Sequence, residues 1–138
     1  MSKNKNALTF TLTTLALLSG CTGVKYEPVE AITLQDGQQQ QIEILGAGDW
    51  RDTGIVVHTS ETYKLTANGT WSMGAICGPT DASGTGVGPL CAGDPWGLGT
   101  NGSTLIGRIG STGKPFKVGD NFTLKPNIKG NLYLRSYD

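Results

Sequence analysis

The sequence of 138 residues has little of the chemistry on which most enzymes and nucleic-acid-binding proteins depend. It contains one histidine, and its eleven basic residues are balanced by eleven acidic residues. Without a basic excess there is no electrostatic basis for nucleic-acid binding. No apolar run approaches the roughly 20 residues needed to cross a bilayer as a helix, and no segment has a helical apolar stripe. The length fits a single domain, and these absences argue against a nucleic-acid-binding protein, a helical membrane protein and a helical fold.

Candidate catalytic groups are also scarce. The single histidine, His58, lies in a strand-like segment without an identifiable partner, so a structural role is the simpler interpretation. A glycosidase needs two facing carboxylates, and the only candidates in the glycine-rich segment from Gly74 to Gly102 are Asp81 and Asp94. Both lie in turn contexts, where aspartate commonly bonds to the local backbone. The sequence therefore predicts a protein that is not an enzyme.

The N-terminus has the pattern of an export signal. Lys3 and Lys5 form a short basic start, and an apolar stretch follows from Ala7 to Leu18. Residues 18–21, Leu-Ser-Gly-Cys, resemble the lipobox of bacterial lipoproteins, in which the cysteine becomes the lipid-modified N-terminus. The alternative is an ordinary signal peptide with a chance cysteine. We expect residues 1–20 to be the signal and Cys21 to be the site of lipidation.

The lipobox resemblance implies anchoring in the cell outer membrane. Each buried methylene of an acyl chain adds about 0.8 kcal/mol of membrane affinity, so two or more chains on Cys21 anchor the protein stably. Thr22 follows the cysteine in place of aspartate, and the sorting pattern of these lipoproteins then implies the outer membrane. Removal of the signal leaves nine basic and eleven acidic residues. Attraction to anionic lipids is therefore not expected to hold the protein at the membrane.

The two remaining cysteines are interpreted from this location. An exported protein meets an oxidising compartment, where a disulfide between Cys77 and Cys91 is the default. It would close a loop of about 15 residues, which is worth roughly 3 kcal/mol on the loop-entropy model. Metal binding is the alternative, although two cysteines without a nearby histidine cannot complete a zinc site.

The rest of the chain divides into a tether, a β domain and a long insertion. Residues 21–41 lack periodicity and are expected to be a tether from the lipidated cysteine. From residue 42 onward, alternating or β-branched segments predict short strands at 41–45, 54–58, 62–67, 70–73, 104–109, 115–118, 121–124 and 132–137. Asn68-Gly69 predicts a tight turn. This spacing predicts an all-β fold, an antiparallel β-sandwich over residues 42–138.

The glycine-rich segment from Gly74 to Gly102 is too long to be a simple connection. Loops of this length are usually functional or disordered. The expected disulfide, together with Pro95 and Trp96, favours an ordered loop and therefore a binding surface. Trp96 could stack on a sugar face, or it could anchor the loop by packing.

Several short blocks after about residue 41 resemble, in order and spacing, the PA-I galactophilic lectin family (LecA-like). No single block is diagnostic, but together they cover most of the domain. The blocks are Trp50-Arg51-Asp52-Thr53-Gly54-Ile55, Ala67-Asn68-Gly69-Thr70-Trp71, Cys77-Gly78-Pro79, Leu105-Ile106-Gly107-Arg108-Ile109-Gly110, Val118-Gly119 and Leu132-Tyr133-Leu134-Arg135-Ser136-Tyr137-Asp138. The resemblance implies a galactose-binding-like, jelly-roll type β-sandwich that binds galactose-type sugars through calcium.

The resemblance also implies which residues hold the metal and the sugar. Asp138 falls on the aspartate that ligates calcium and faces the sugar, although Ser136-Tyr137 departs from the family's pattern at that corner. A backbone carbonyl near Met73 or Gly74 falls on a second ligand. Calcium needs about 6–8 oxygen ligands, so these two cannot hold it alone. The family's sugar-holding histidine and glutamine have no clear counterparts here.

Two interpretations follow from the incomplete calcium site. In the family, further ligands and a returning strand come just after this aspartate, so the sequence is expected to be a fragment that lacks its C-terminal strand. Alternatively, the protein keeps the sandwich without a sugar site and acts as a non-catalytic structural or interaction lipoprotein of the envelope. The first interpretation predicts a calcium-dependent, carbohydrate-binding lipoprotein. The sequence leaves the oligomeric state open.

Overall fold

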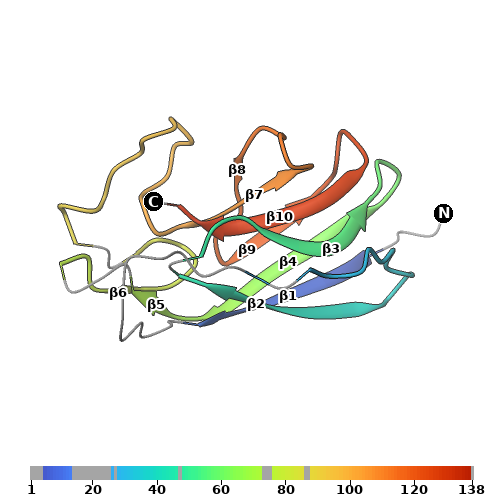
Figure 1. The fold of residues 1–138 in the computed structure, drawn as a ribbon, viewed down its shortest axis with the longest axis horizontal. Helices are drawn as coiled ribbons and strands as arrows, with labels where there is room; N and C mark the ends of the chain where they lie inside the picture. Colours follow the sequence, from blue (N-terminus) through green and yellow to red (C-terminus); the bar gives the residue numbers. More distant parts are fainter. Residues whose placement is uncertain are drawn as a thin grey trace.

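The computed structural model describes residues 5–13, 26, 28–46, 48–72, 76–85 and 88–137, and for residues 5–13 it describes the backbone alone. In these residues the chain forms strands and no helix, which confirms the predicted all-β fold (Figure 1). Within the same residues, no helix exists that is long and apolar enough to cross a membrane.

The described chain contains two four-stranded sheets. The first sheet has the order β2-β1-β4-β9, with β1 at Lys5–Thr13, β2 at Gln39–Leu45, β4 at Thr62–Gly69 and β9 at Asn121–Leu124. The second has the order β3-β10-β7-β8, with β3 at Arg51–Val57, β7 at Leu105–Ile109, β8 at Phe116–Lys117 and β10 at Gly130–Ser136. A small pair, β5 (Trp71–Ser72) and β6 (Pro79–Thr80), lies beside them.

Alternation along the strands builds one core from both sheets. In β10, Leu132 and Leu134 are fully buried, whereas Tyr133 and Arg135 between them are partly exposed. This is the period of two that sends successive side chains to opposite faces of a sheet. The buried cluster joins the two sheets and contains Leu34, Ile42, Ile44, Ile55, Val57, Tyr63, Leu65, Trp71, Ala82, Leu105, Ile109, Val118, Leu124, Leu132 and Leu134.

A bulge at Gly54 in β3 fits the strand to its neighbours. Gly54 has φ +73°, and a Cβ there would lie 2.6 Å from the carbonyl oxygen of Glu30. The side chain of Thr53 is buried and its hydroxyl donates to the Leu132 carbonyl at 2.7 Å. The register between β3 and β10 shifts at this point. Glycine is therefore required here both for its backbone conformation and for the close approach of another segment.

Strand β1 is built from residues that the sequence analysis assigns to the export signal. It lies between β2 and β4 and pairs parallel with both, for example Phe10 with Ile42 on one side and with Ala67 on the other. The remaining strand pairs of the two large sheets are antiparallel. Cys21 and the rest of the lipobox lie outside the described residues.

Part of the segment expected to be a tether packs on the domain. Ile32 forms a parallel bridge with Ile55, its amide donates to the Gly54 carbonyl at 2.7 Å, and its carbonyl accepts from the Val56 amide at 2.9 Å. Leu34 is buried, and β2 starts three residues before the domain start expected at residue 42. Part of the segment expected to be a tether therefore belongs to the β domain.

The turn expected at Asn68-Gly69 does not make a hairpin. Gly69 has φ +93° and ends β4, but the next strand, β5, pairs with β6 and not with β4. The positive φ agrees with the glycine signal. After Gly69 the chain leaves the first sheet. The indole of Trp71 is then fully buried in the core.

Candidate functional site

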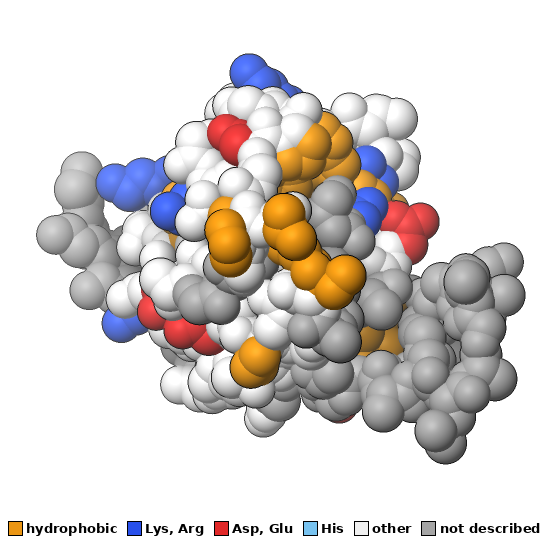
Figure 2. Space-filling model, turned by 90° about the vertical axis from the view of Figure 1, so that its left-hand side faces the viewer, with side chains coloured by type: hydrophobic (Ala, Val, Ile, Leu, Met, Phe, Trp, Pro, Cys, Tyr) orange, Lys and Arg blue, Asp and Glu red, His pale blue; other side chains and the backbone are white. Residues whose placement is uncertain are grey.

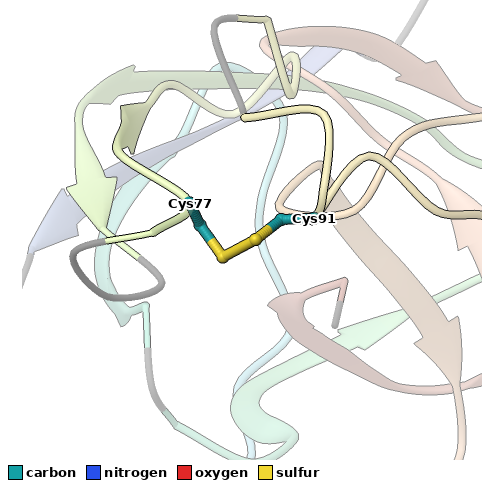
Figure 3. The surroundings of a disulfide bond; sticks show 2 residues. All are labelled: Cys77 and Cys91. Carbon is teal, nitrogen blue, oxygen red and sulfur yellow. A yellow bond between two sulfur atoms is a disulfide. The ribbon is translucent and has the colours of Figure 1, made fainter.

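A disulfide fixes the start of the loop that carries Trp96. Cys77 and Cys91 are bonded as predicted, with their Cα atoms 5.5 Å apart (Figure 3). The Gly88 amide donates to the Cys77 carbonyl at 2.8 Å, and the Cys91 amide donates to the Gly88 carbonyl at 2.9 Å. The described residues on both sides of the cross-link are thus held together, and residues 92–100 leave from a fixed point.

The side chain of Tyr137 holds the middle of that loop. Tyr137 follows β10 and is fully buried. Its hydroxyl accepts a hydrogen bond from the Trp96 amide at 2.7 Å and donates one to Asp94 Oδ1 at 2.5 Å. Asp94 in turn accepts from the amides of Leu98 at 2.7 Å and Gly99 at 2.8 Å. A loop without regular structure is therefore positioned by a tyrosine from the core.

This network shifts the acidity of both partners. The hydrogen bond from Tyr137, assisted by the Leu98 and Gly99 amides, lowers the pKa of the Asp94 carboxyl. Burial raises the pKa of the Tyr137 phenol, and its hydrogen bond to Asp94 raises it further. At neutral pH the pair is therefore a carboxylate and a neutral phenol, the combination in which the phenol donates to the carboxylate.

Around Trp96, aromatic rings and arginines form a continuous cluster. Trp50 and Trp96 stack with ring centroids 6.4 Å apart and planes at 17°. The Arg135 guanidinium carbon lies 5.7 Å from each of these ring centroids. The Arg108 guanidinium carbon lies 4.3 Å from the Trp50 centroid and 5.3 Å from that of Tyr133. We call these five residues the aromatic–arginine patch.

The patch lies on the outer face of the second sheet. Arg108 in β7 is opposite Tyr133 in β10, and both alternate with buried neighbours, as does Arg135. Trp50 is the residue just before β3, and Trp96 lies in the loop that follows Cys91. Trp96 remains 44% exposed. Strands β7 and β10, the residue before β3 and one loop thus supply a surface on which one tryptophan is open to solvent.

The loop end of the molecule also exposes other hydrophobic side chains. Figure 2 shows this end, with hydrophobic groups gathered near its centre and charged groups around them. The side chains of Ile76 and Leu90 are 74% and 85% exposed, and both belong to the loop region. Hydrophobic groups that gather on one face of a soluble domain usually mark a binding surface.

The residues expected to bind calcium, unlike Trp96, are not among those that the structure describes. Met73, Gly74 and Asp138 lie outside the described residues, as does Cys21. Their described neighbours do converge, because the Trp71 indole donates to the Ser103 carbonyl at 2.9 Å and the Ser103 amide donates to the Tyr137 carbonyl. The described ends of β5 and β10 therefore meet through one residue.

The described residues do not assemble a metal centre by themselves. Among them, no group of three or more His, Cys, Asp or Glu side chains could hold an ion. The carboxylate of Asp138 and one backbone carbonyl would provide two oxygen ligands, and calcium needs about 6–8. Those two expected ligands alone therefore do not complete the calcium site, and calcium binding stays a prediction of the resemblance.

The two other polar residues considered for catalysis are engaged locally. Asp81 Oδ1 accepts from the Ser83 amide at 2.9 Å, from the Ser83 hydroxyl and from the Thr85 hydroxyl at 3.3 Å. The hydrogen bond from the Ser83 side chain is the main reason that the pKa of Asp81 is lowered. His58 Nε2 lies 3.4 Å from the Thr33 hydroxyl. Asp81 thus makes the turn contacts expected for aspartate.

Most of the patch was not anticipated from the sequence. Only Trp96 was singled out as a binding residue, while Trp50, Arg108, Tyr133 and Arg135 were part of the resemblance blocks without an assigned role. The available signal was the alternation in β10, which places Tyr133 and Arg135 on one face. The stacking of Trp50 on Trp96 joins residues 46 positions apart in the chain and has no local sequence signature.

Comparison with protein-family models, curated proteins and solved structures finds no significant match to this chain.

Proposed function

We propose that the protein is an outer-membrane lipoprotein whose LecA-like β domain binds carbohydrate without catalysing a reaction. The lipobox-like residues 18–21 support the anchor, with Cys21 as the acylated residue. The order and spacing of the sequence blocks support the family resemblance. The two β-sheets that share a core, one mixed and one antiparallel, are compatible with it.

The observation that carries the binding proposal is the partly exposed ring of Trp96. The Trp96 side chain is 44% exposed, so a ligand with an apolar face would gain free energy by burying the open part of the indole. Here a buried tyrosine fixes the backbone of Trp96, and Trp50 supports its ring. A rigid aromatic face of this kind can stack on the apolar face of a pyranose ring, as a pre-ordered side chain loses little entropy on binding.

Calcium belongs to this proposal through Asp138 and the carbonyl near Met73 or Gly74. Because those residues do not complete a calcium shell, we derive no step of sugar binding through the ion. Galactose-type sugars are the first ligands to test, since they are what the resemblance implies.

The test is an equilibrium titration of the full-length protein with galactosides, with calcium and with a chelator. We expect a saturable signal at millimolar sugar or below, lost in Trp96→Ala. Trp50→Phe, which keeps an aromatic support, is expected to retain binding. If calcium takes part, the chelator weakens the signal. A folded wild-type protein that gives no signal with any galactoside would refute galactose-type sugars as its ligands.

A second function is favoured by the exposed side chains of Ile76 and Leu90. Two large aliphatic groups that are mostly open to solvent are typical of protein–protein contact surfaces rather than of sugar sites. In that case the domain would be an envelope interaction module. Crosslinking in intact cells separates the two functions, because an Ile76→Ser, Leu90→Ser double variant should then lose its crosslinked partner while sugar binding is unaffected.

A further inference from the structure

The charges of the aromatic–arginine patch suggest which carbohydrates it binds. This inference rests on the proposed function, carbohydrate binding. Arg108 and Arg135 both lie under or beside tryptophan rings on the same sheet face. Arg135 is 3.4 Å from the Asp49 carboxylate, so its charge is partly balanced within the chain. Arg108 has no such partner among the described residues.

Arg108 also has unused hydrogen-bonding capacity. Its Nε is buried without a hydrogen-bond partner in the described part of the chain. The contacts with the Trp50 and Tyr133 rings are not hydrogen bonds, so they do not use up the N–H groups of the guanidinium. The Arg108 side chain as a whole is only partly buried. An anionic oxygen at its accessible N–H groups would accept hydrogen bonds and neutralise the charge.

The nearby carboxylates do not fill this role. Asp94 is tied to Tyr137, Leu98 and Gly99 within the loop. Asp49 pairs with Arg135. Asp52 accepts from the side-chain amide of Asn131 at 3.2 Å and from the backbone amide of Gly54 at 2.9 Å. Each of these carboxylates thus already has donors of its own, which leaves the local excess of positive charge at Arg108.

We infer that the patch prefers acidic saccharides, with a sugar ring on Trp96 and Trp50 and a carboxylate on the N–H edges of Arg108. Guanidinium and carboxylate groups match in geometry and form two parallel hydrogen bonds, which are stronger than bonds between neutral groups. A neutral sugar can stack on the same rings but leaves Arg108 without an acceptor. The chain has no overall positive charge, so the preference comes from the local arrangement.

The test compares galacturonate oligosaccharides with their methyl esters, which have the same rings without the charge, on the full-length protein. We expect the acid form to bind about tenfold more tightly at low salt, since a charge-assisted hydrogen bond is worth at least about a factor of ten. The ratio should fall as ionic strength rises, because Arg108 is only partly buried and its charge is screened.

Two variants assign the preference to Arg108. In Arg108→Gln the ratio of acid to ester affinity should fall to about one, and in Arg108→Lys it should be intermediate, because the charge remains and the paired donors are lost. Lys64→Gln, an exposed charge in β4 on the other sheet, should keep the wild-type ratio. Because the readout is a ratio within one variant, a moderate loss of stability does not change it.

The outcomes separate the two proposals. Equal binding of acid and ester by the wild-type protein would overturn the inference and leave the carbohydrate proposal intact. A tenfold ratio that persists in Arg108→Gln would overturn the role of Arg108. The absence of binding to acid, ester and galactosides alike, with a folded protein, would overturn the proposed function itself.

Discussion

At the scale of single residues, a buried tyrosine side chain fixes the loop that carries the exposed Trp96. Tyr137 is buried, yet its hydroxyl sets the position of Trp96 through the backbone amide and of Asp94 through the carboxylate. The backbone at Trp96 is therefore tied directly to the residue that follows β10. A binding residue placed in this way needs little ordering when a ligand arrives.

Asp94 makes the order of this loop depend on pH. Its folded-state pKa is lowered, so its contribution to stability is complete above the ordinary aspartate pKa of about 3.9 and is lost as pH falls through the folded value. We predict that the free energy of unfolding declines below about pH 4 and that Asp94→Asn removes part of this decline. Denaturant titrations at several pH values check it.

The control for this prediction lies within the same protein. Asp81, whose pKa is also lowered, remains in both proteins and contributes equally to their acid sensitivity. The difference between the two curves therefore reports Asp94 alone. Identical pH dependence in the wild type and the Asp94→Asn variant would contradict the assigned network.

At the scale of elements, the disulfide gives the loop its fixed start. We predict that the Cys77→Ser, Cys91→Ser double variant loses roughly 3 kcal/mol of unfolding free energy, because the unfolded chain regains the entropy of the open loop. Denaturant unfolding of the two proteins measures the loss. A reductant should lower the wild-type stability and leave the variant unchanged; equal stability of the two proteins without reductant would count against this account.

Strand β1 makes a second prediction at this scale. If the signal is removed before Cys21, β2 and β4 lose the strand that pairs with both, and their facing backbone groups need new partners. We predict that a chain starting at Cys21 is less stable than the full chain by several kcal/mol, at about 1 kcal/mol per backbone hydrogen bond. Thermal and denaturant unfolding compare the two chains.

A peptide that contains residues 5–13, added to the chain starting at Cys21, tests the cause of that loss. Restored stability would show that the gap between β2 and β4 accepts an extended strand. A peptide of the same composition in scrambled order is the control. Equal stability of the two chains without any peptide would contradict the role of β1 as a pairing strand.

Strands with a clear local pattern could be predicted from the sequence, and those decided by distant partners could not. The alternation in β2, β4, β9 and β10 predicted each of them to within a few residues. The pairing of β5 with β6 was missed because Asn68-Gly69 suggested a local hairpin, whereas the partner of β5 lies further along the chain at Pro79–Thr80. The disulfide was predicted from its compartment. The arginines of the patch were missed because cation–π contacts leave no pattern in sequence.

At the scale of the whole molecule, the proposed anchor and the binding end define how the protein would be displayed. At the loop end of the molecule, exposed hydrophobic side chains gather on one face (Figure 2). Many copies on one membrane would bind a polysaccharide with an avidity that exceeds the affinity of each site. Weak binding by a single domain is therefore compatible with strong attachment of a cell.

The anchor itself is tested by Cys21→Ala. We predict that this variant loses its acylation and leaves the membrane fraction. The nine basic and eleven acidic residues that remain after removal of the signal would not attract anionic lipids in place of the acyl chains. Fractionation with metabolic labelling by a palmitate analogue measures both properties, and Cys21→Ser serves as a second non-acylated variant. Unchanged membrane association would refute the lipid anchor and leave the sugar-binding proposal to be judged on its own.

The most direct test of the central claim follows the three tryptophan indole signals of the labelled full-length protein by NMR during a titration with sugar. Trp96 and Trp50 are in the patch, whereas Trp71 is fully buried with its indole bonded to Ser103. The account predicts saturable shifts of the Trp96 and Trp50 signals and none at Trp71. Signals that do not move, or a shift confined to Trp71, would contradict it.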